Sequence, residues 1–74
     1  MPRINLSAPT DYKGRNGWGI CTGISVWKRP YTNPPTIEIR PINSKGQEAS
    51  GCHIGIPLED LESFIELLRR VARE

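Results

Sequence analysis

The sequence predicts an α+β fold, a three- to four-stranded antiparallel meander followed by one C-terminal helix. Two observations predict it. Residues 18–56 alternate apolar and polar side chains in short runs that Gly, Pro and Asn separate, which is typical of β-strands joined by turns. Residues 58–73 instead repeat apolar side chains at helical spacing. Because the strands come first and the single helix last, few small architectures fit.

Three strands follow from the alternation of apolar and polar residues. They are expected at Trp18–Lys28, Thr36–Ile42 and Ala49–Ile56. In the first strand the even positions are apolar, so Trp18 is predicted to lie in the core. The odd positions, Trp27 among them, are predicted to form the opposite face.

The chain before Trp18 has a less definite pattern. Arg3–Leu6 fits either an edge strand or a disordered arm, so residues 1–10 are separated from a sheet-and-helix domain at 11–74. Asp11–Gly17 contains Gly and Asn and is predicted to be a turn or hairpin tip.

Two further connections are marked by their turn residues. Arg29–Pro35 is rich in proline and cannot be a central strand. Asn43–Gln47 is a polar turn in which Gly46 suits a left-handed backbone conformation. Pro57 fits the first position of the helix.

The helix, predicted at Leu58–Arg73, is expected to cover one face of the sheet. Its apolar face consists of Leu61, Phe64, Ile65, Leu68, Val71 and Ala72. A chain of 74 residues with 36% hydrophobic residues has a marginal core, so a homodimer paired through this helix is expected. The opposite, open face is expected to present Gly23, Ser25, Trp27, Glu38, Arg40, His53 and Gly55.

Charge separates the sheet from the helix. The net charge is only +2, but residues 1–57 carry seven Lys or Arg against three acids, and residues 58–74 carry three Arg against five acids. A basic sheet would face a polyanion, and a tryptophan beside an arginine is a platform for an unstacked base. The candidate nucleic-acid-binding residues are Lys13, Arg15, Trp27, Lys28, Arg29, Tyr31, Arg40 and Lys45.

Each of these residues also has a plainer explanation. Trp27 could pack against a dimer partner, and the cations could be scattered surface charges. Tyr31 could sit in a connection that its prolines merely stiffen.

No enzyme, metal site or cofactor is predicted. His53 has no nucleophile or acid placed to act with it. Cys52 and His53, adjacent on an expected strand, would point to opposite faces and could not hold one zinc ion together. Cys21 and Cys52 are expected to be reduced, although a disulfide between them is not excluded by the sequence. Without an apolar leader or a long apolar run, the chain is expected to be cytoplasmic, with no membrane contact.

Residues 11–29 resemble a known family. The run Asp11-Tyr12-Lys13-Gly14-Arg15 leads into a Trp/Ile-rich strand that ends Val26-Trp27-Lys28. This is similar to the single-stranded-DNA-binding transcriptional coactivators called positive cofactor four. The segment His53–Leu58 is similar to that family's last strand and the start of its helix.

The resemblance implies a homodimer packed through its helices that holds single-stranded DNA against its β-surfaces, with Lys13 and Arg15 in contact. The segments Asn16–Gly19 and Pro30–Pro35 depart from the family pattern.

Two functions remain open from the sequence. The first is a small non-enzymatic protein of the transcription-regulator type that binds single-stranded DNA or RNA through the basic and aromatic residues of the sheet. The second is a protein–protein interaction module, of the kind used by phage or plasmid regulators. It would act through an exposed sheet edge or the Pro-rich connection.

Overall fold

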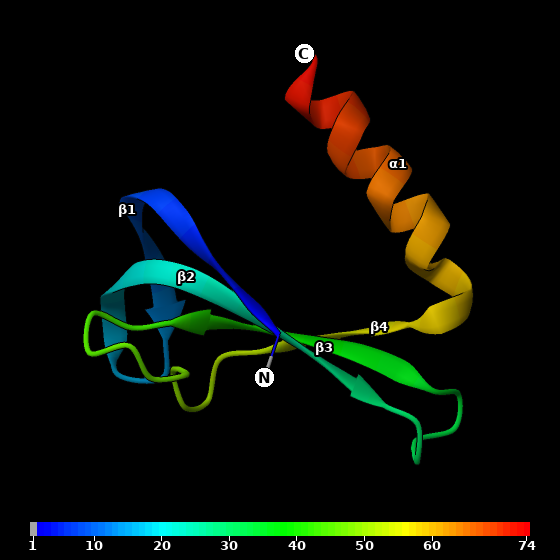
Figure 1. Ribbon diagram of the computed structural model, residues 1–74, viewed down its shortest axis with the longest axis horizontal. Coiled ribbons are helices and arrows are strands. Elements are labelled where there is room, and N and C mark those ends of the chain that lie inside the picture. The colour runs from blue at the N-terminus through cyan, green and yellow to red at the C-terminus, as the bar shows by residue number, and fades with distance from the viewer. Residues whose placement is uncertain (1) are drawn as a thin grey trace.

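The computed structural model describes residues 2–74 as one four-stranded antiparallel sheet followed by a helix (Figure 1). The strands follow one another in the sheet in sequence order, so the predicted meander and α+β fold are confirmed. The elements are β1 (Arg3–Gly14), β2 (Gly17–Arg29), β3 (Thr36–Ile42), β4 (Ile54–Pro57), the 3₁₀-helix η1 (Leu58–Asp60) and α1 (Leu61–Ala72).

Strand β1 is an edge strand, the first of the two alternatives for the N-terminal segment. It pairs with β2 at Arg3–Asn5 and again at Thr10–Gly14, and the register shifts between the two stretches. The hairpin tip predicted within Asp11–Gly17 is confirmed but shorter, because only Arg15 and Asn16 separate the two strands and Asp11–Gly14 belong to β1. The interruption includes Pro9, which cannot donate a hydrogen bond to the neighbouring strand.

The last strand is much shorter than the predicted Ala49–Ile56. Regular pairing with β3 is confined to β4, and before it there is one isolated pairing between Ile42 and Glu48. Residues 43–53 form a loop that we call the strap. It turns at Gly46 and Gly51, both at positive φ. Since Cys52 and His53 lie in the strap, the opposed orientation predicted from a strand does not apply to them.

The face of the sheet predicted to be open is buried, and the face predicted to be buried is exposed. Ser25 and Glu38 lie on the face expected to be open, yet only 1% and 3% of their surfaces are exposed. The strap lies against that face, where Glu48 binds Ser25. The apolar face is the one that meets solvent: Trp18 is 70% exposed, so its assignment to the core is wrong. We call this the isoleucine face, and its exposed members are Ile4, Ile20 and Ile54.

Helix α1 leaves the end of the sheet and does not cover it (Figure 1). None of its residues, all of which the structure describes, is buried, and Leu68 is 53% exposed. The prediction of a helix packed on its own sheet is therefore wrong. The cause is the short connection: β4 runs directly into η1, where the Leu58 amide donates to the Pro35 carbonyl at 2.9 Å. This bond fixes the start of the helix beside the β2–β3 loop.

Close packing of β1 on β2 gives a test of the sheet. A Cβ at Gly23 would lie 2.6 Å from the Ile4 carbonyl oxygen, whereas a Cβ at Gly55 would meet no atom within 4 Å. We expect Gly23→Ala to destabilise the fold by about 1–3 kcal/mol, because backbone must move to relieve the clash. Gly55→Ala, the matched control, should change stability by less than about 0.5 kcal/mol. Urea unfolding of both variants measures the difference, and equal stabilities would contradict the observed pairing.

Candidate nucleic-acid interface

A hollow of about 340 Å³ surrounds the indole of Trp27. It brings together residues from the end of β2, the β2–β3 connection, β3 and the strap. Its lining consists of Trp27, Lys28, Arg29, Tyr31, Glu38, Arg40 and Glu48. Five of the eight residues predicted from the sequence therefore share one site, which we call the Trp27 hollow.

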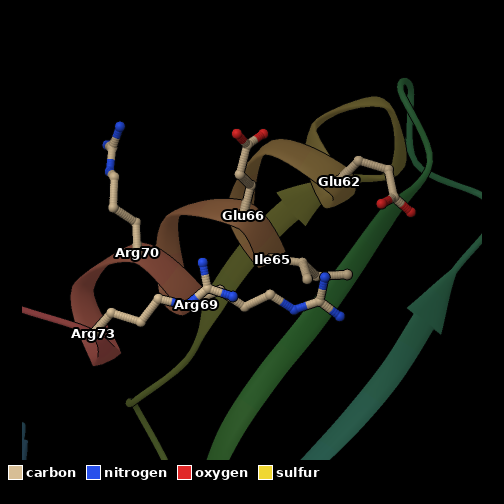
Figure 2. A pocket seen from close by; sticks show the side chains of 6 residues that line it. All are labelled: Glu62, Ile65, Glu66, Arg69, Arg70 and Arg73. Atoms are coloured by element: carbon tan, nitrogen blue, oxygen red, sulfur yellow. The ribbon is translucent and has the colours of Figure 1, made fainter.

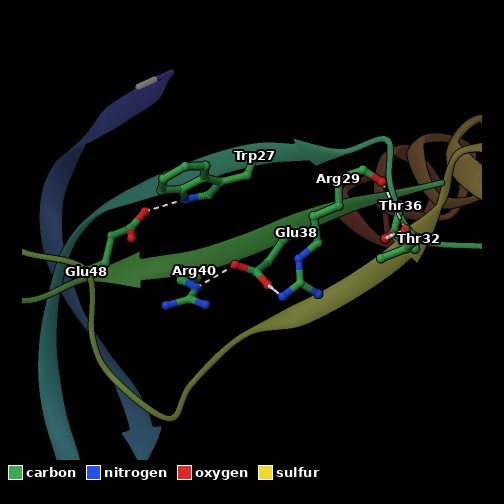
Figure 3. A network of polar contacts seen from close by, with 7 residues as sticks. All are labelled: Trp27, Arg29, Thr32, Thr36, Glu38, Arg40 and Glu48. Atoms are coloured by element: carbon green, nitrogen blue, oxygen red, sulfur yellow. Dashed lines mark hydrogen bonds and ion pairs between the residues drawn. The ribbon is translucent and has the colours of Figure 1, made fainter.

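The indole of Trp27 is held by the strap. Its Nε1 donates to Oε2 of Glu48 at 2.6 Å (Figure 3). The Ser25 hydroxyl donates to the same oxygen at 2.5 Å. The hydrogen bonds from Ser25 and then Trp27 lower the pKa of Glu48 below its ordinary value of 4.5. Trp27 as a whole stays 38% exposed, so its polar edge is bound while part of the residue remains accessible.

Two arginines flank a buried carboxylate opposite the indole (Figure 3). Arg40 Nε donates to Oε2 of Glu38 at 2.6 Å, and this bond raises the pKa of Arg40. Arg29 Nη2 lies 2.9 Å from Oε1 of Glu38, close enough for an ion pair but without hydrogen-bond geometry. The two guanidinium side chains are 35% and 29% exposed, so both also reach solvent.

Glu38 and Glu48 are the residues of the site that no sequence pattern predicts. The alternation of the second strand places Glu38 on the open face but assigns it no partner, and Glu48 lies in the strap, whose path no strand pattern reveals. With both acids present, the hollow holds three cations and two anions. Lys28 is the cation of this group that takes part in no ion pair within the described residues.

Tyr31 projects from a connection that is tied at its base. The Thr32 hydroxyl lies 2.9 Å from the Arg29 carbonyl oxygen and from the Thr36 hydroxyl (Figure 3). It lies at the same distance from the Pro34 carbonyl oxygen. These contacts close the loop between β2 and β3. Tyr31 is 79% exposed and lines the Trp27 hollow, so the connection presents an aromatic ring at its edge.

The other three predicted cations lie outside this hollow. Lys13 is in β1, where its Nζ lies 5.9 Å from the centre of the Trp18 ring. Arg15 is in the β1–β2 turn, and Lys45 is exposed in the strap. The predicted set is therefore divided between the Trp27 hollow, the β1–β2 hairpin end and the strap.

Two further hollows have different chemistry. One, of about 480 Å³, lies on the isoleucine face, where Ile24, Ile39 and Ile54 line it together with both cysteines. Both thiols are free, and the described residues contain no cluster that could hold a metal ion. The other, of about 530 Å³, is lined by side chains of α1 alone (Figure 2). The first hollow is mainly apolar, and a single helix cannot enclose a ligand in the second. Neither is therefore an alternative to the Trp27 hollow as a polar binding site.

Comparison of the chain with protein-family models, with curated proteins and with solved structures found no match. The resemblance to the coactivator family therefore stays a prediction. No helix among residues 2–74 is both long and apolar enough to cross a bilayer.

The pH dependence of stability tests the Glu48 contact. Because folding lowers the Glu48 pKa, the carboxylate stabilises the fold above its ordinary value of 4.5, and this contribution is lost as the pH falls through the lowered pKa. We expect Glu48→Gln to lose stability at neutral pH and to show a weaker decline below pH 4.5 than the wild type. Thermal unfolding across this range measures the effect. Parallel pH profiles for the two proteins would contradict the contact.

Proposed function

We propose that this protein is a small non-enzymatic binder of single-stranded nucleic acid, acting as a homodimer. The observation that carries the proposal is the Trp27 hollow, where two aromatic side chains and three cations from different segments meet in one open site. Aromatic rings beside cations are the usual means of holding an unstacked base and its phosphate without reading sequence.

The arrangement of charge inside the hollow favours base stacking on Trp27 and phosphate contact at Lys28. Glu38 and Glu48 neutralise much of the charge near the indole, so a phosphate gains little there. A base has no such penalty and can stack on the accessible ring of Trp27. Lys28, which is exposed and unpaired within the described residues, is the natural contact for the adjoining phosphate.

The homodimer is supported by two unpartnered apolar surfaces in one chain. The isoleucine face carries an apolar hollow, and no residue of α1 is buried. The helix itself stands away from the sheet (Figure 1). Only four apolar side chains are buried among the described residues. A second copy supplies surfaces of the same kind, so pairing through the helices would remove the apolar side of α1 from water, and the isoleucine face is available to the same partner.

The interaction-module alternative draws on the same isoleucine face. Ile4, Ile20 and Ile54 are each more than half exposed, an arrangement found at protein interfaces. If a different protein covers this face, a nuclease-treated pull-down would recover it in equal amounts with the chain. In a homodimer, the second copy covers the face itself.

Binding of an unstructured DNA strand tests the proposed function. We expect salt-sensitive binding that favours single strands over duplex, because counterions are released from neutralised phosphates. Trp27→Ala should weaken binding by about 1–3 kcal/mol, the usual effect of one stacked base, while Trp27→Phe should keep most of it. Fluorescence anisotropy of a labelled oligonucleotide measures the salt dependence, the preference for single strands and the affinities of both variants. Absence of any signal at low salt would reject the function.

A substitution on the apolar side of α1 tests the homodimer. Leu68 is exposed in a single chain, so Leu68→Glu would be nearly neutral for a monomer. In a helix-paired dimer it should cost at least about 2 kcal/mol, because burial of a leucine is lost and a charge is buried instead. Ser63→Glu introduces the same residue on the polar side of α1 and serves as the control. Light scattering should show that only Leu68→Glu dissociates the dimer, and a monomeric wild type would refute the assembly.

A further inference from the structure

The end of the β1–β2 hairpin carries a second aromatic side chain among cations. Trp18 is 70% exposed at the start of β2, Lys13 lies over its ring across the strand pair, and Arg15 occupies the adjoining turn. We propose that this hairpin end is a second stacking site, which binds a base and phosphate of the same nucleic-acid strand. The inference rests on the proposed function and extends it to residues that the Trp27 hollow does not include.

The geometry at the hairpin end suits a flat ligand. A hollow of about 290 Å³ lies between the hairpin and the strap, with Trp18 and Arg15 in its lining. Three glycines, Gly14, Gly17 and Gly19, contribute backbone without side chains, so a ligand can approach the main chain closely. Tyr12 packs its ring directly against Gly19, where an added Cβ would come within 2.6 Å of it. This contact supports the hairpin beneath the exposed indole.

Charge favours an anionic strand as the occupant of the hairpin end. The described residues that line this hollow include Arg15 and no carboxylate. Neither Lys13 nor Arg15 forms an ion pair in the described part of the chain. In the Trp27 hollow, by contrast, both arginines are paired with Glu38. The hairpin end therefore offers the less neutralised phosphate contacts of the two sites.

The two indoles are nine positions apart along β2, which corresponds to at most about 30 Å at the usual rise of an extended strand. Because this spacing is odd, they lie on opposite faces of the sheet, and a strand that contacts both must pass round the sheet. A short oligonucleotide could occupy either site, whereas a longer one could reach both. The proposal therefore predicts that the contribution of Trp18 grows with the length of the strand.

Tryptophan fluorescence can report on this site alone once Trp27 is replaced, because the chain then keeps a single tryptophan. In Trp27→Phe, Trp18 is the single emitter, and aromatic character is kept at position 27. We expect unlabelled oligothymidine of about 20 nucleotides, longer than a typical single-fold site, to quench Trp18 emission saturably. The midpoint should match that of anisotropy measured with a labelled strand. Anisotropy that reports binding while Trp18 emission stays constant would overturn the inference and leave the proposed function intact.

Affinity provides the second measurement. Trp18→Ala should weaken binding of the same long strand about tenfold, towards the lower end of the range for one stacked base, and Trp18→Phe should restore most of it. Gln47→Ala removes an exposed side chain of the strap that lines neither hollow, and it should leave the affinity unchanged. If Trp18→Ala instead dissociates the dimer, position 18 belongs to a protein interface and the inference fails. Equal weakening by Gln47→Ala would likewise overturn it. If the wild type binds no oligonucleotide, the proposed function fails with it.

Discussion

The contact between the strap and the sheet decides which face of this small domain meets water. The Glu48 carboxylate accepts hydrogen bonds from Ser25 and Trp27, and Ala49 is buried next to it on the strap. Once the strap covers that side, the isoleucine face remains open and the indole of Trp27 is fixed at the edge of the strap. The exposed apolar surface and the Trp27 hollow thus both follow from one polar contact.

An open isoleucine face and an unpacked helix are costly for a single chain. Burial of one large apolar side chain contributes about 1.5–3 kcal/mol, a large share of the 5–15 kcal/mol by which domains are usually stable. Leu68, Val71 and Ile54 each remain more than half exposed. If two copies share these surfaces, stability and assembly are one equilibrium, and the fold depends on protein concentration. Nucleic-acid binding would then present two copies of each site to one strand.

The order and type of the elements could be predicted from the sequence, because alternation and helical spacing are local patterns. The assignment of the faces could not. Trp18 shares the register of the isoleucines, and the prediction of a buried Trp18 assumed that the apolar side of the sheet faces inward. That assumption required the helix to fold back. The hydrogen bond from Leu58 to Pro35, which directs it away, joins segments that no local pattern connects. The positions of Glu38 and Glu48 in the site likewise depend on the path of the strap.

The two aromatic sites differ in how their charges are balanced, and this difference gives them different roles in binding a strand. Near Trp27, buried Glu38 holds Arg29 and Arg40 in place and reduces their attraction for phosphate, so contact there depends on the ring. At the hairpin end, Lys13 and Arg15 have no such partner in the described residues, and phosphate attraction is correspondingly greater. A flexible strand that passes round the sheet could therefore be attracted first to the hairpin end and then be held by stacking at Trp27, which lies on the other face of β2.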